Sequence, residues 1–254
     1  MSSDITETGH HRGTAVVTGA ARGLGRTFAL ALAETGHDLA LLDLTEADQT
    51  RAEIEALGRR CVVMAGDASD PEAVRAFGES VRSRLPAVRV LVNNAGISPY
   101  SPFTETSLET WQRIMRVNLD SMFLLSQEFL PDLAGSGCGR IINLTSTVVW
   151  DAQARNMTAY TTSKAGIVGF TRALAGEVGR DGITVNCIAP GIVLTPDIQE
   201  RVADAQLEIY RHRQAVPQLA RTEDLVSALL FLADERSGLV TGTVVPVNGG
   251  RVIL

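Results

Sequence analysis

A tyrosine and a lysine four residues apart, Tyr160 and Lys164, are the pair in this chain with the clearest chemical potential. On a helix this spacing places both side chains on one face. Free tyrosine has a pKa of about 10 and is a weak base at neutral pH. Lowering that pKa by three units takes about 4 kcal/mol of preferential stabilisation of the phenolate. We expect the Lys164 ammonium to supply much of it, so the pair predicts proton exchange with a hydroxyl group.

A glycine-rich segment, Thr18–Gly25, joins an apolar strand-like run to an apolar helical run. Glycine lets the backbone approach a phosphate closely, and the N-terminus of the following helix favours negative charge. The segment therefore predicts a dinucleotide site. Combined with the tyrosine and lysine, it indicates hydride transfer between a nicotinamide cofactor and a hydroxyl-bearing carbon. The positive nicotinamide of the oxidised cofactor would help Lys164 to stabilise the phenolate. The residues assigned to this turn are Gly19, Arg22, Gly23, Leu24 and Gly25.

The choice between NAD and NADP depends on Asp43, which lies 18 residues after Gly25 at the end of the second predicted strand. A carboxylate there accepts hydrogen bonds from ribose hydroxyls and repels a 2′-phosphate. Arg22 favours NADP instead, because a guanidinium binds a 2′-phosphate well. We give Asp43 more weight, since like-charge contact in a partly buried site costs on the order of several kcal/mol. The sequence thus predicts NAD as the cofactor, with NADP second.

Other polar residues follow the ends of predicted strands, where a ligand crevice opens in sheets of this kind. Asp67, followed by Ala68, is placed to meet the adenine amino group; the alternative is a turn residue that caps a helix. After the next strand come Asn94, Ala95 and Gly96, which we also assign to the cofactor.

Two further side chains are candidates for the chemistry. Ser146 follows the strand-like run Arg140–Leu144, and its hydroxyl can hold the substrate oxygen. Asn118 lies inside a helical pattern, where asparagine is unfavourable. A buried amide there can hold a water that relays protons toward Lys164. The alternatives are that Ser146 is a turn residue and Asn118 a satisfied core amide.

Strand-like and helical patterns alternate along the whole chain. This alternation predicts an α/β fold with a mainly parallel sheet covered by helices on both faces. Helices are expected to begin near Leu24, Ala47, Pro71, Leu108, Met157 and Thr222, with Asp70 as an N-cap and Gly58 as a C-cap. The predicted strands are Thr14–Thr18, Asp38–Leu42, Cys61–Ala65, Val88–Asn93, Arg140–Leu144, Thr184–Ile188 and Val244–Val247.

Bulk properties narrow the class of protein. A chain of 254 residues suits one large domain, expected over residues 13–254 after a flexible tail at 1–12. Residues 190–217 are expected to form a lid over the site. The net charge of −6 argues against nucleic-acid and anionic-membrane partners. Neither a membrane span, nor a secretory signal, nor a metal-ligand spacing is found, so we expect a cytoplasmic protein without a metal.

In combination, the glycine turn, Asn93–Gly96, Ser146, Tyr160 and Lys164 resemble the short-chain dehydrogenase/reductase family, over Thr14–Gly250. The resemblance implies a three-layer Rossmann-like sheet of seven strands, a homotetramer, and a catalytic set of Ser146, Tyr160 and Lys164 supported by Asn118. It also implies that Tyr160 and Lys164 touch the nicotinamide ribose. The residues implied to contact the nicotinamide end are Pro190, Gly191, Val193 and Thr195.

The chain departs from the family pattern in the spacing of Ser146 and Tyr160, which is 14 residues and one more than usual. Thr147 would satisfy the commoner spacing, but Ser146 follows directly from the strand and is preferred. Asn248 also stands where many relatives have Asp.

Within the family, two subgroups compete. The 3-oxoacyl-carrier-protein reductases commonly use NADPH and dock their carrier on basic residues, where this chain has Gly137 and Gly176. The stretch Ile141–Trp150 looks more like NAD-dependent secondary-alcohol dehydrogenases of the 1-phenylethanol type, which we favour.

Apolar and aromatic residues gather in the segments expected to wall the pocket, chiefly Tyr100, Trp150 and Ile192, with Pro99, Phe103 and Met157 nearby. An apolar pocket with one polar corner suits a hydrophobic secondary alcohol or ketone. The alternative is that these residues pack the lid or a subunit interface. A non-catalytic dinucleotide-sensing regulator is the distant alternative, and it would be expected to lack the tyrosine or the lysine.

Overall fold

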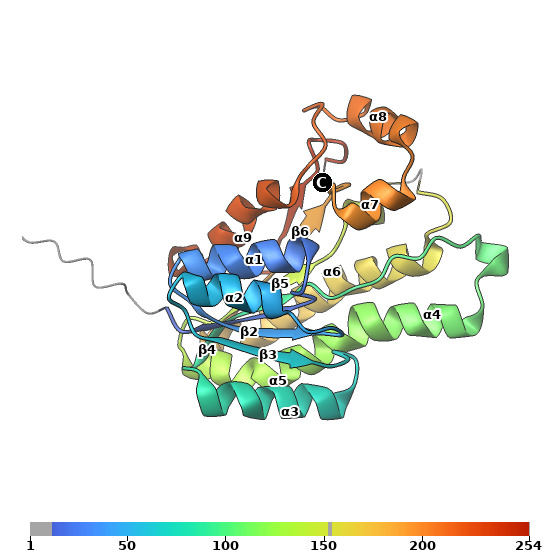
Figure 1. The fold of residues 1–254 in the computed structure, drawn as a ribbon. Coiled ribbons are helices and arrows are strands. Elements are labelled where there is room, and N and C mark those ends of the chain that lie inside the picture. Colours follow the sequence, from blue (N-terminus) through green and yellow to red (C-terminus); the bar gives the residue numbers. More distant parts are fainter. Residues whose placement is uncertain (1–11, 152–153, 254) are drawn as a thin grey trace, which may run out of the picture.

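The computed structural model describes residues 12–151 and 154–253; the predicted tail falls outside them, apart from Arg12. Within the described residues seven strands form one parallel sheet in the order β3-β2-β1-β4-β5-β6-β7 (Figure 1). This confirms the predicted α/β class and the parallel sheet. The strands are β1 Thr14–Thr18, β2 Asp38–Asp43, β3 Cys61–Ala65, β4 Val88–Asn93, β5 Arg140–Leu144, β6 Thr184–Pro190 and β7 Val244–Val247.

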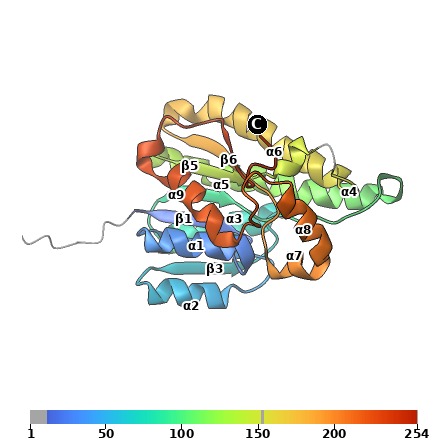
Figure 2. The same cartoon turned by 90° about the horizontal axis from the view of Figure 1, so that it is seen from above.

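Helices cover both faces of this sheet and form a Rossmann-like arrangement. One face carries α1, α2 and α9, and the other carries α3, α5 and α6, with α4 beside α6 (Figure 1). The short α7 and α8 stand at the end of the sheet where β6 finishes (Figure 1 and Figure 2). The helices are α1 Gly23–Glu34, α2 Asp48–Ala56, α3 Pro71–Arg84, α4 Leu108–Met115, α5 Ser121–Gly135, α6 Thr158–Val178, α7 Pro196–Arg201, α8 Asp204–His212 and α9 Val226–Ala233.

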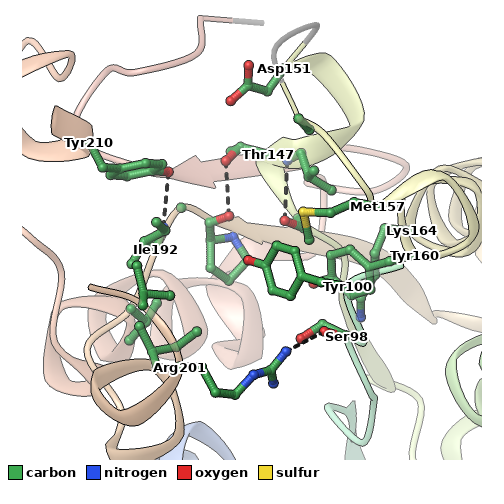
Figure 3. Close-up of a pocket in the computed structure, with 18 of the residues that line it drawn as sticks. Ser98, Tyr100, Thr147, Asp151, Met157, Tyr160, Lys164, Ile192, Arg201 and Tyr210 are labelled. Atoms are coloured by element: carbon green, nitrogen blue, oxygen red, sulfur yellow. Dashed lines mark hydrogen bonds between the residues drawn. The ribbon is translucent and has the colours of Figure 1, made fainter. Parts of the chain in front are cut away.

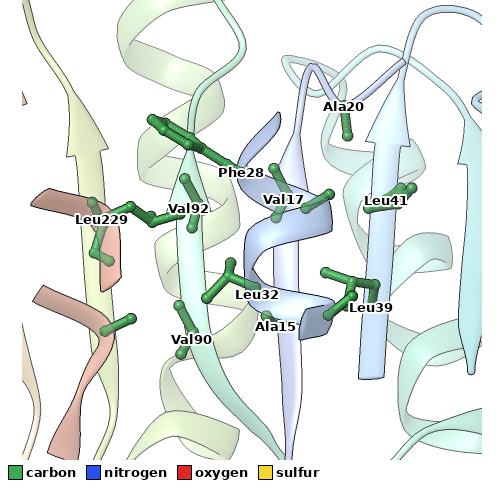
Figure 4. Packing of buried hydrophobic residues seen from close by; sticks show 14 of the residues in the cluster. Ala15, Val17, Ala20, Phe28, Leu32, Leu39, Leu41, Val90, Val92 and Leu229 are labelled. Carbon is green, nitrogen blue, oxygen red and sulfur yellow. The ribbon is translucent and has the colours of Figure 1, made fainter. Parts of the chain in front are cut away.

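In the described part of the chain, the two larger apolar clusters lie one on each face of the sheet and hold the layers together. Alternate residues of β1 serve opposite clusters, because side chains alternate along a strand: Ala15 and Val17 pack under α1, and Val16 packs under α3 and α5. Figure 4 shows the first cluster, with Phe28 of α1 among the strand residues. A strand buried on both faces needs a continuous apolar run, which is why these strands could be found in the sequence.

The order of the strands in the sheet determines where the candidate site lies. β1 lies between β2 and β4, so the connections leaving β1 and β4 run to opposite sides of the sheet. A crevice opens at the carboxyl ends of the strands at such a switch point. The glycine turn follows β1 and the Asn93–Gly96 segment follows β4, so both lie at this crevice.

The predicted helix caps Asp70 and Gly58 are confirmed. Asp70 caps α3 by accepting a hydrogen bond from the Glu72 amide (3.0 Å), and Gly58, with a φ of +74°, follows the end of α2. Some details differ from the prediction. β2 continues one residue further, to Asp43. β6 continues two residues further, to Pro190, and the helix predicted near Thr222 begins as a 3₁₀ turn before α9. The helical pattern from Leu108 is interrupted by a π-helical segment, Arg116–Asp120.

Candidate active site

The glycine turn after β1 adopts a conformation that requires glycine. Gly19 and Gly23 have φ values of +65° and +57°, which other residues rarely adopt. A Cβ on Gly25 would lie 2.0 Å from the Gly19 carbonyl oxygen, so α1 packs against the turn without room for a side chain. Arg22 precedes α1 and is exposed, and its side chain makes no capping hydrogen bond to the helix. The amide groups at this helix N-terminus suit a bound phosphate.

The segment after β4 is tied to the glycine turn by hydrogen bonds. The Asn94 side-chain amide donates to the carbonyls of Thr18 (2.8 Å) and Gly19 (3.1 Å). The backbone amides of Asn94 and Ala95 donate to the Thr18 hydroxyl (3.1 and 3.0 Å). Asn94 therefore fixes the turn itself. Thr18, which begins the predicted glycine-rich segment but was not assigned to the cofactor, belongs to the site for the same reason.

Asp43 and Asp67 stand at the ends of β2 and after β3, in different environments. Asp43 accepts a hydrogen bond from the Ala21 amide in the glycine turn (2.9 Å) and another from the Thr45 amide (3.2 Å). Its carboxylate is thus held beside the turn. Asp67 accepts from the Ser69 amide (2.8 Å) and hydroxyl (2.7 Å), with half-buried Ala68 between them. It closes a turn, while Asp70 caps the helix. These positions fit a dinucleotide cradle along β1, β2 and β3.

Tyr160 and Lys164 both lie in the first two turns of α6, with the Lys164 Nζ 5.7 Å from the centroid of the Tyr160 ring. Burial raises the pKa of Tyr160 to about 12, although its hydrogen bond with Ser146 acts in the opposite direction. Burial also lowers the pKa of Lys164 to about 8. The protein groups by themselves therefore leave the phenol a weak base near neutral pH. Desolvation of the phenolate outweighs the nearby ammonium.

Ser146, rather than Thr147, presents its hydroxyl to Tyr160. Ser146 accepts a hydrogen bond from the Val148 amide (3.3 Å) and is hydrogen-bonded to the Tyr160 phenol. Thr147 is buried, and its hydroxyl donates to the Pro190 carbonyl (3.1 Å) (Figure 3). The residue chosen from the strand end is thus the one beside the tyrosine.

Asn118 sits in the π-helical segment and is buried. Its Oδ1 accepts from the Ile97 amide (2.8 Å), and its Nδ2 donates to the Ile97 carbonyl (2.9 Å) and the Ser163 hydroxyl (3.0 Å). Both hydrogens of the amide nitrogen therefore have protein partners. These contacts agree with the alternative of a satisfied core amide. Asn118 joins the segment after β4 to α6, next to Lys164.

A cavity of about 900 Å³ brings most of the predicted residues together (Figure 3). Leu24, Asn94 and Gly96 line it beside Ser146, Tyr160 and Lys164. Tyr100, Met157 and Ile192 also line it, as do the four residues expected at the nicotinamide end, Pro190, Gly191, Val193 and Thr195.

Some predicted wall residues lie elsewhere, because loop conformation decides which side of a loop faces the cavity. Trp150 is not among the lining residues, and Phe103 is 72% exposed. Pro99 lines an adjoining cavity of about 600 Å³ beside Arg22 and Gly23.

The wall also contains residues that sequence reasoning missed. The Tyr210 phenol accepts a hydrogen bond from the Ile192 amide (3.0 Å), and the Arg251 guanidinium lies 4.3 Å from the Tyr210 ring centroid. Arg251 donates twice to Asp151, at 2.6 and 3.2 Å. Asp151 and Arg251 are 100 positions apart in the chain, so no local pattern could indicate their contact.

Within residues 12–151 and 154–253, none of the helices has both the length and the apolar character needed to cross a membrane. The same residues contain no group of His, Cys, Asp or Glu side chains arranged for a metal ion.

Comparisons with known proteins agree with this geometry. Residues 19–251 match the family model described as enoyl-(acyl carrier protein) reductase. The chain is 37% identical to subunit BbsD of a hydroxy(phenyl)methylsuccinyl-CoA dehydrogenase from Thauera aromatica, covering 93% of this chain and 95% of that one. It is also 37% identical to the 3-oxoacyl-acyl-carrier-protein reductase FabG of Pseudomonas aeruginosa, covering 93% and 96%.

A solved structure shares the fold. A putative NAD(P)-dependent gluconate 5-dehydrogenase from Beutenbergia cavernae, with bound NADP at low occupancy, superposes with a TM-score of 0.89 at 35% identity. The superposition covers 95% of this chain and 97% of that one.

Proposed function

Because the chain belongs to the short-chain dehydrogenase/reductase family, an oxidoreductase family that acts on CH–OH groups, we propose that it transfers hydride between NAD and a hydrophobic secondary alcohol or its ketone. The observation that carries the proposal is the cavity where Ser146, Tyr160 and Lys164 meet the glycine-turn side of the sheet. The three side chains act on the hydroxyl group, and the cradle holds the cofactor.

Each side chain of the set has a defined task. Tyr160 takes the hydroxyl proton during oxidation and returns it during reduction. Ser146, already hydrogen-bonded to the phenol, holds the substrate oxygen. Lys164 Nζ donates to the Leu144 carbonyl (2.7 Å), which leaves two further hydrogens for the cofactor ribose. Asn118 positions the segment after β4 beside Lys164.

An oxidised nicotinamide held in this cradle would supply the hydride acceptor, and its positive charge would favour the Tyr160 phenolate. This second contribution is needed, because burial alone raises the pKa of Tyr160 to about 12. In this proposal Ile192, whose amide donates to the Tyr210 phenol, forms the wall at the nicotinamide end. Pro190, Gly191, Val193 and Thr195 complete this wall.

The preference for NAD rests on Asp43, whose carboxylate is fixed beside the turn by the Ala21 amide. Asp67 and Ala68 lie further along the same edge and would serve the adenine. The Beutenbergia structure holds NADP, so the preference of this chain requires a direct test. Residues 190–217, which contain α7 and α8, form the substrate lid.

The apolar part of the substrate is assigned to the wall around Tyr100, Met157 and Ile192. The second candidate is reduction of 3-oxoacyl thioesters with NADPH, which the similarity to the Pseudomonas reductase favours. Gly137 and Gly176 at the expected carrier-docking positions argue against it.

We also propose a cytoplasmic homotetramer. Cys61, Cys138 and Cys187 are free thiols, which suits a reducing compartment. Leu108 on α4 and Phe123 on α5 are exposed large apolar side chains that would suit subunit contacts. Light scattering on the purified protein would give the assembly mass directly.

The test is a screen of cofactor reduction with 1-phenylethanol, aliphatic secondary alcohols and 3-hydroxyacyl thioesters, with NAD and NADP in parallel. We expect NAD-dependent oxidation of the apolar alcohols. Tyr160→Phe should lower kcat at least about 100-fold, while NADH binding, followed by fluorescence, stays within a few-fold. If Tyr160→Phe retained a tenth of the wild-type kcat, the assignment of the base would be wrong. Faster turnover of thioesters than of any simple alcohol would replace this proposal by the second candidate.

A further inference from the structure

The cavity around Tyr160 is richer in positive charge than the chain as a whole. The protein carries a net charge of −6. Among the described lining residues, however, five side chains are cationic and two are carboxylates. The cations are Arg155, Lys164, Arg201, Arg213 and Arg251, and the carboxylates are Asp151 and Asp197.

The phosphates of a dinucleotide do not account for all of these cations. The glycine turn borders the adjoining cavity, which has its own arginines, Arg22 and Arg113, and shares Arg201. Arg155, Arg213 and Arg251 line only the cavity that contains Tyr160. We call these three the distal arginines. They stand apart from the turn expected to hold the pyrophosphate.

The distal arginines come from three separate segments, and each segment has contacts with neighbours at the cavity wall. Arg251 is bonded to Asp151, stacks on Tyr210 and has a side chain only 11% exposed. Arg213 directly follows α8, and its amide bonds to the Tyr210 carbonyl (3.2 Å). Arg155 precedes Asn156, whose carbonyl accepts from the Ser101 amide (2.9 Å) beside Tyr100.

The cations of the cavity differ in whether a carboxylate lies next to them. Asp151 offsets the charge of Arg251, and Asp197 offsets that of Arg201 at 3.0 Å. In the described part of the chain, no carboxylate forms an ion pair with Arg155. Cations gathered on one cavity wall repel each other unless an anion lies between them, and guanidinium groups match carboxylate geometry with paired hydrogen bonds.

We infer that the cavity contains an anion subsite formed by Arg155 and Arg213, which binds a carboxylate carried by the substrate itself. The inference rests on the proposed function for the site of oxidation and adds the substrate class: a secondary hydroxy acid or keto acid with an apolar body. The hydroxyl lies at Ser146 and Tyr160, the apolar body lies along Tyr100 and Ile192, and the carboxylate reaches the distal arginines.

The first experiment measures binding without turnover. Calorimetry in the presence of NAD compares 4-ethylbenzoate with 4-ethylbenzamide, which has a similar shape but no charge. We expect the acid to bind at least about tenfold more tightly, in line with a charge-assisted hydrogen bond. Arg155→Gln and Arg213→Gln should each remove most of this difference, and Arg155→Lys should keep part of it. Arg180→Gln is the control, because Arg180 is an exposed arginine in the 3₁₀ turn before β6 and lines neither cavity.

Equal affinities for the acid and the amide would overturn the inference. It would also be overturned if Arg155→Gln and Arg213→Gln reduced the preference for the acid no more than Arg180→Gln does. Tighter binding of 4-ethylphenyl phosphate than of the carboxylate would assign the subsite to a phosphate ester and also overturn it.

The second experiment separates this inference from the proposed function. It compares kcat/KM for 4-(1-hydroxyethyl)benzoate and 1-phenylethanol. We expect a preference for the acid that falls about tenfold in Arg155→Gln. Oxidation of both alcohols at equal kcat/KM would leave the proposed function intact and refute the subsite. Oxidation of neither, with a retained binding preference for the acid, would refute the proposed function and support the subsite.

Discussion

Replacing Asp43 by Asn tests the origin of cofactor preference with the smallest change of shape. In the structure the Asp43 carboxylate accepts from the Ala21 amide at 2.9 Å and from the Thr45 amide at 3.2 Å. Asn keeps one acceptor oxygen, which can stay on Ala21, and removes the charge. The glycine turn should therefore retain its position while the electrostatic effect on a 2′-phosphate disappears.

The size of the effect follows from Coulomb's law. Two unit charges about 5 Å apart at an effective dielectric constant of about 20 repel by about 3 kcal/mol. Asp43 is half-buried, and we take screening to reduce this to about 1.5 kcal/mol, roughly tenfold for each unit of phosphate charge. A 2′-phosphate with about two charges is then disfavoured roughly 100-fold. Loss of a charged hydrogen bond to the ribose weakens the binding of NAD by about tenfold, which adds to the change in the ratio.

The assay is kcat/KM for NAD and for NADP at a saturating concentration of an oxidisable alcohol. The NAD-to-NADP ratio should fall by roughly three orders of magnitude in Asp43→Asn. Asp67→Asn is the matched control, because the adenine that Asp67 is proposed to meet is common to both cofactors. Its ratio should stay within about threefold of wild type. Equal use of the two cofactors by the wild-type protein, or an equal change in both variants, would refute the role of Asp43.

Four further expectations follow from the geometry. Burial raises the pKa of Tyr160 to about 12 and lowers that of Lys164 to about 8, so both groups stay protonated below about pH 7, and the reduction rate should stay flat between about pH 5 and 7 while oxidation rises with pH. A Cβ at Gly25 would lie 2.0 Å from the Gly19 carbonyl, so Gly25→Ala should weaken NADH binding at least about tenfold in a fluorescence titration, whereas Gly176→Ala, with open space, should not. Asp151→Asn should lower the unfolding free energy by about 2 kcal/mol in denaturant titrations, because it breaks the pair with Arg251. Phe77→Ala should lower it by about 4 kcal/mol, since the ring is fully buried against Phe129.

The parts of the fold found in the sequence are those with local causes. The strands are buried on both faces, so their apolar runs stand out, and Asp70 followed by Pro71 marks the start of α3 through hydrogen bonding and a fixed φ. The π-helical segment around Asn118 could not be found this way, because it adds one residue to a helix without breaking the apolar pattern.

The walls of the cavity were harder still to predict. Trp150 and Phe103 are apolar residues in segments next to the site, and only the path of the backbone decides that they do not line it. Arg251 reaches the cavity from the C-terminal segment by pairing with Asp151, a contact that depends on tertiary structure alone. The sequence therefore indicated the reaction more fully than the substrate.

The unusual spacing between Ser146 and Tyr160 shows which contacts set the catalytic geometry. Hydrogen bonds join the end of β5 to α6: the hydroxyl of Thr145, one residue after the strand, donates to the Lys164 carbonyl (2.7 Å), and Lys164 Nζ donates to the Leu144 carbonyl (2.7 Å). These bonds fix the end of β5 against α6, and with it the position of Ser146 relative to Tyr160. The strand end and the helix, rather than the number of residues between them, therefore set the catalytic geometry. Direct alignment from the strand therefore identifies the serine, whereas counting back from the tyrosine leads to Thr147, which is buried against Pro190.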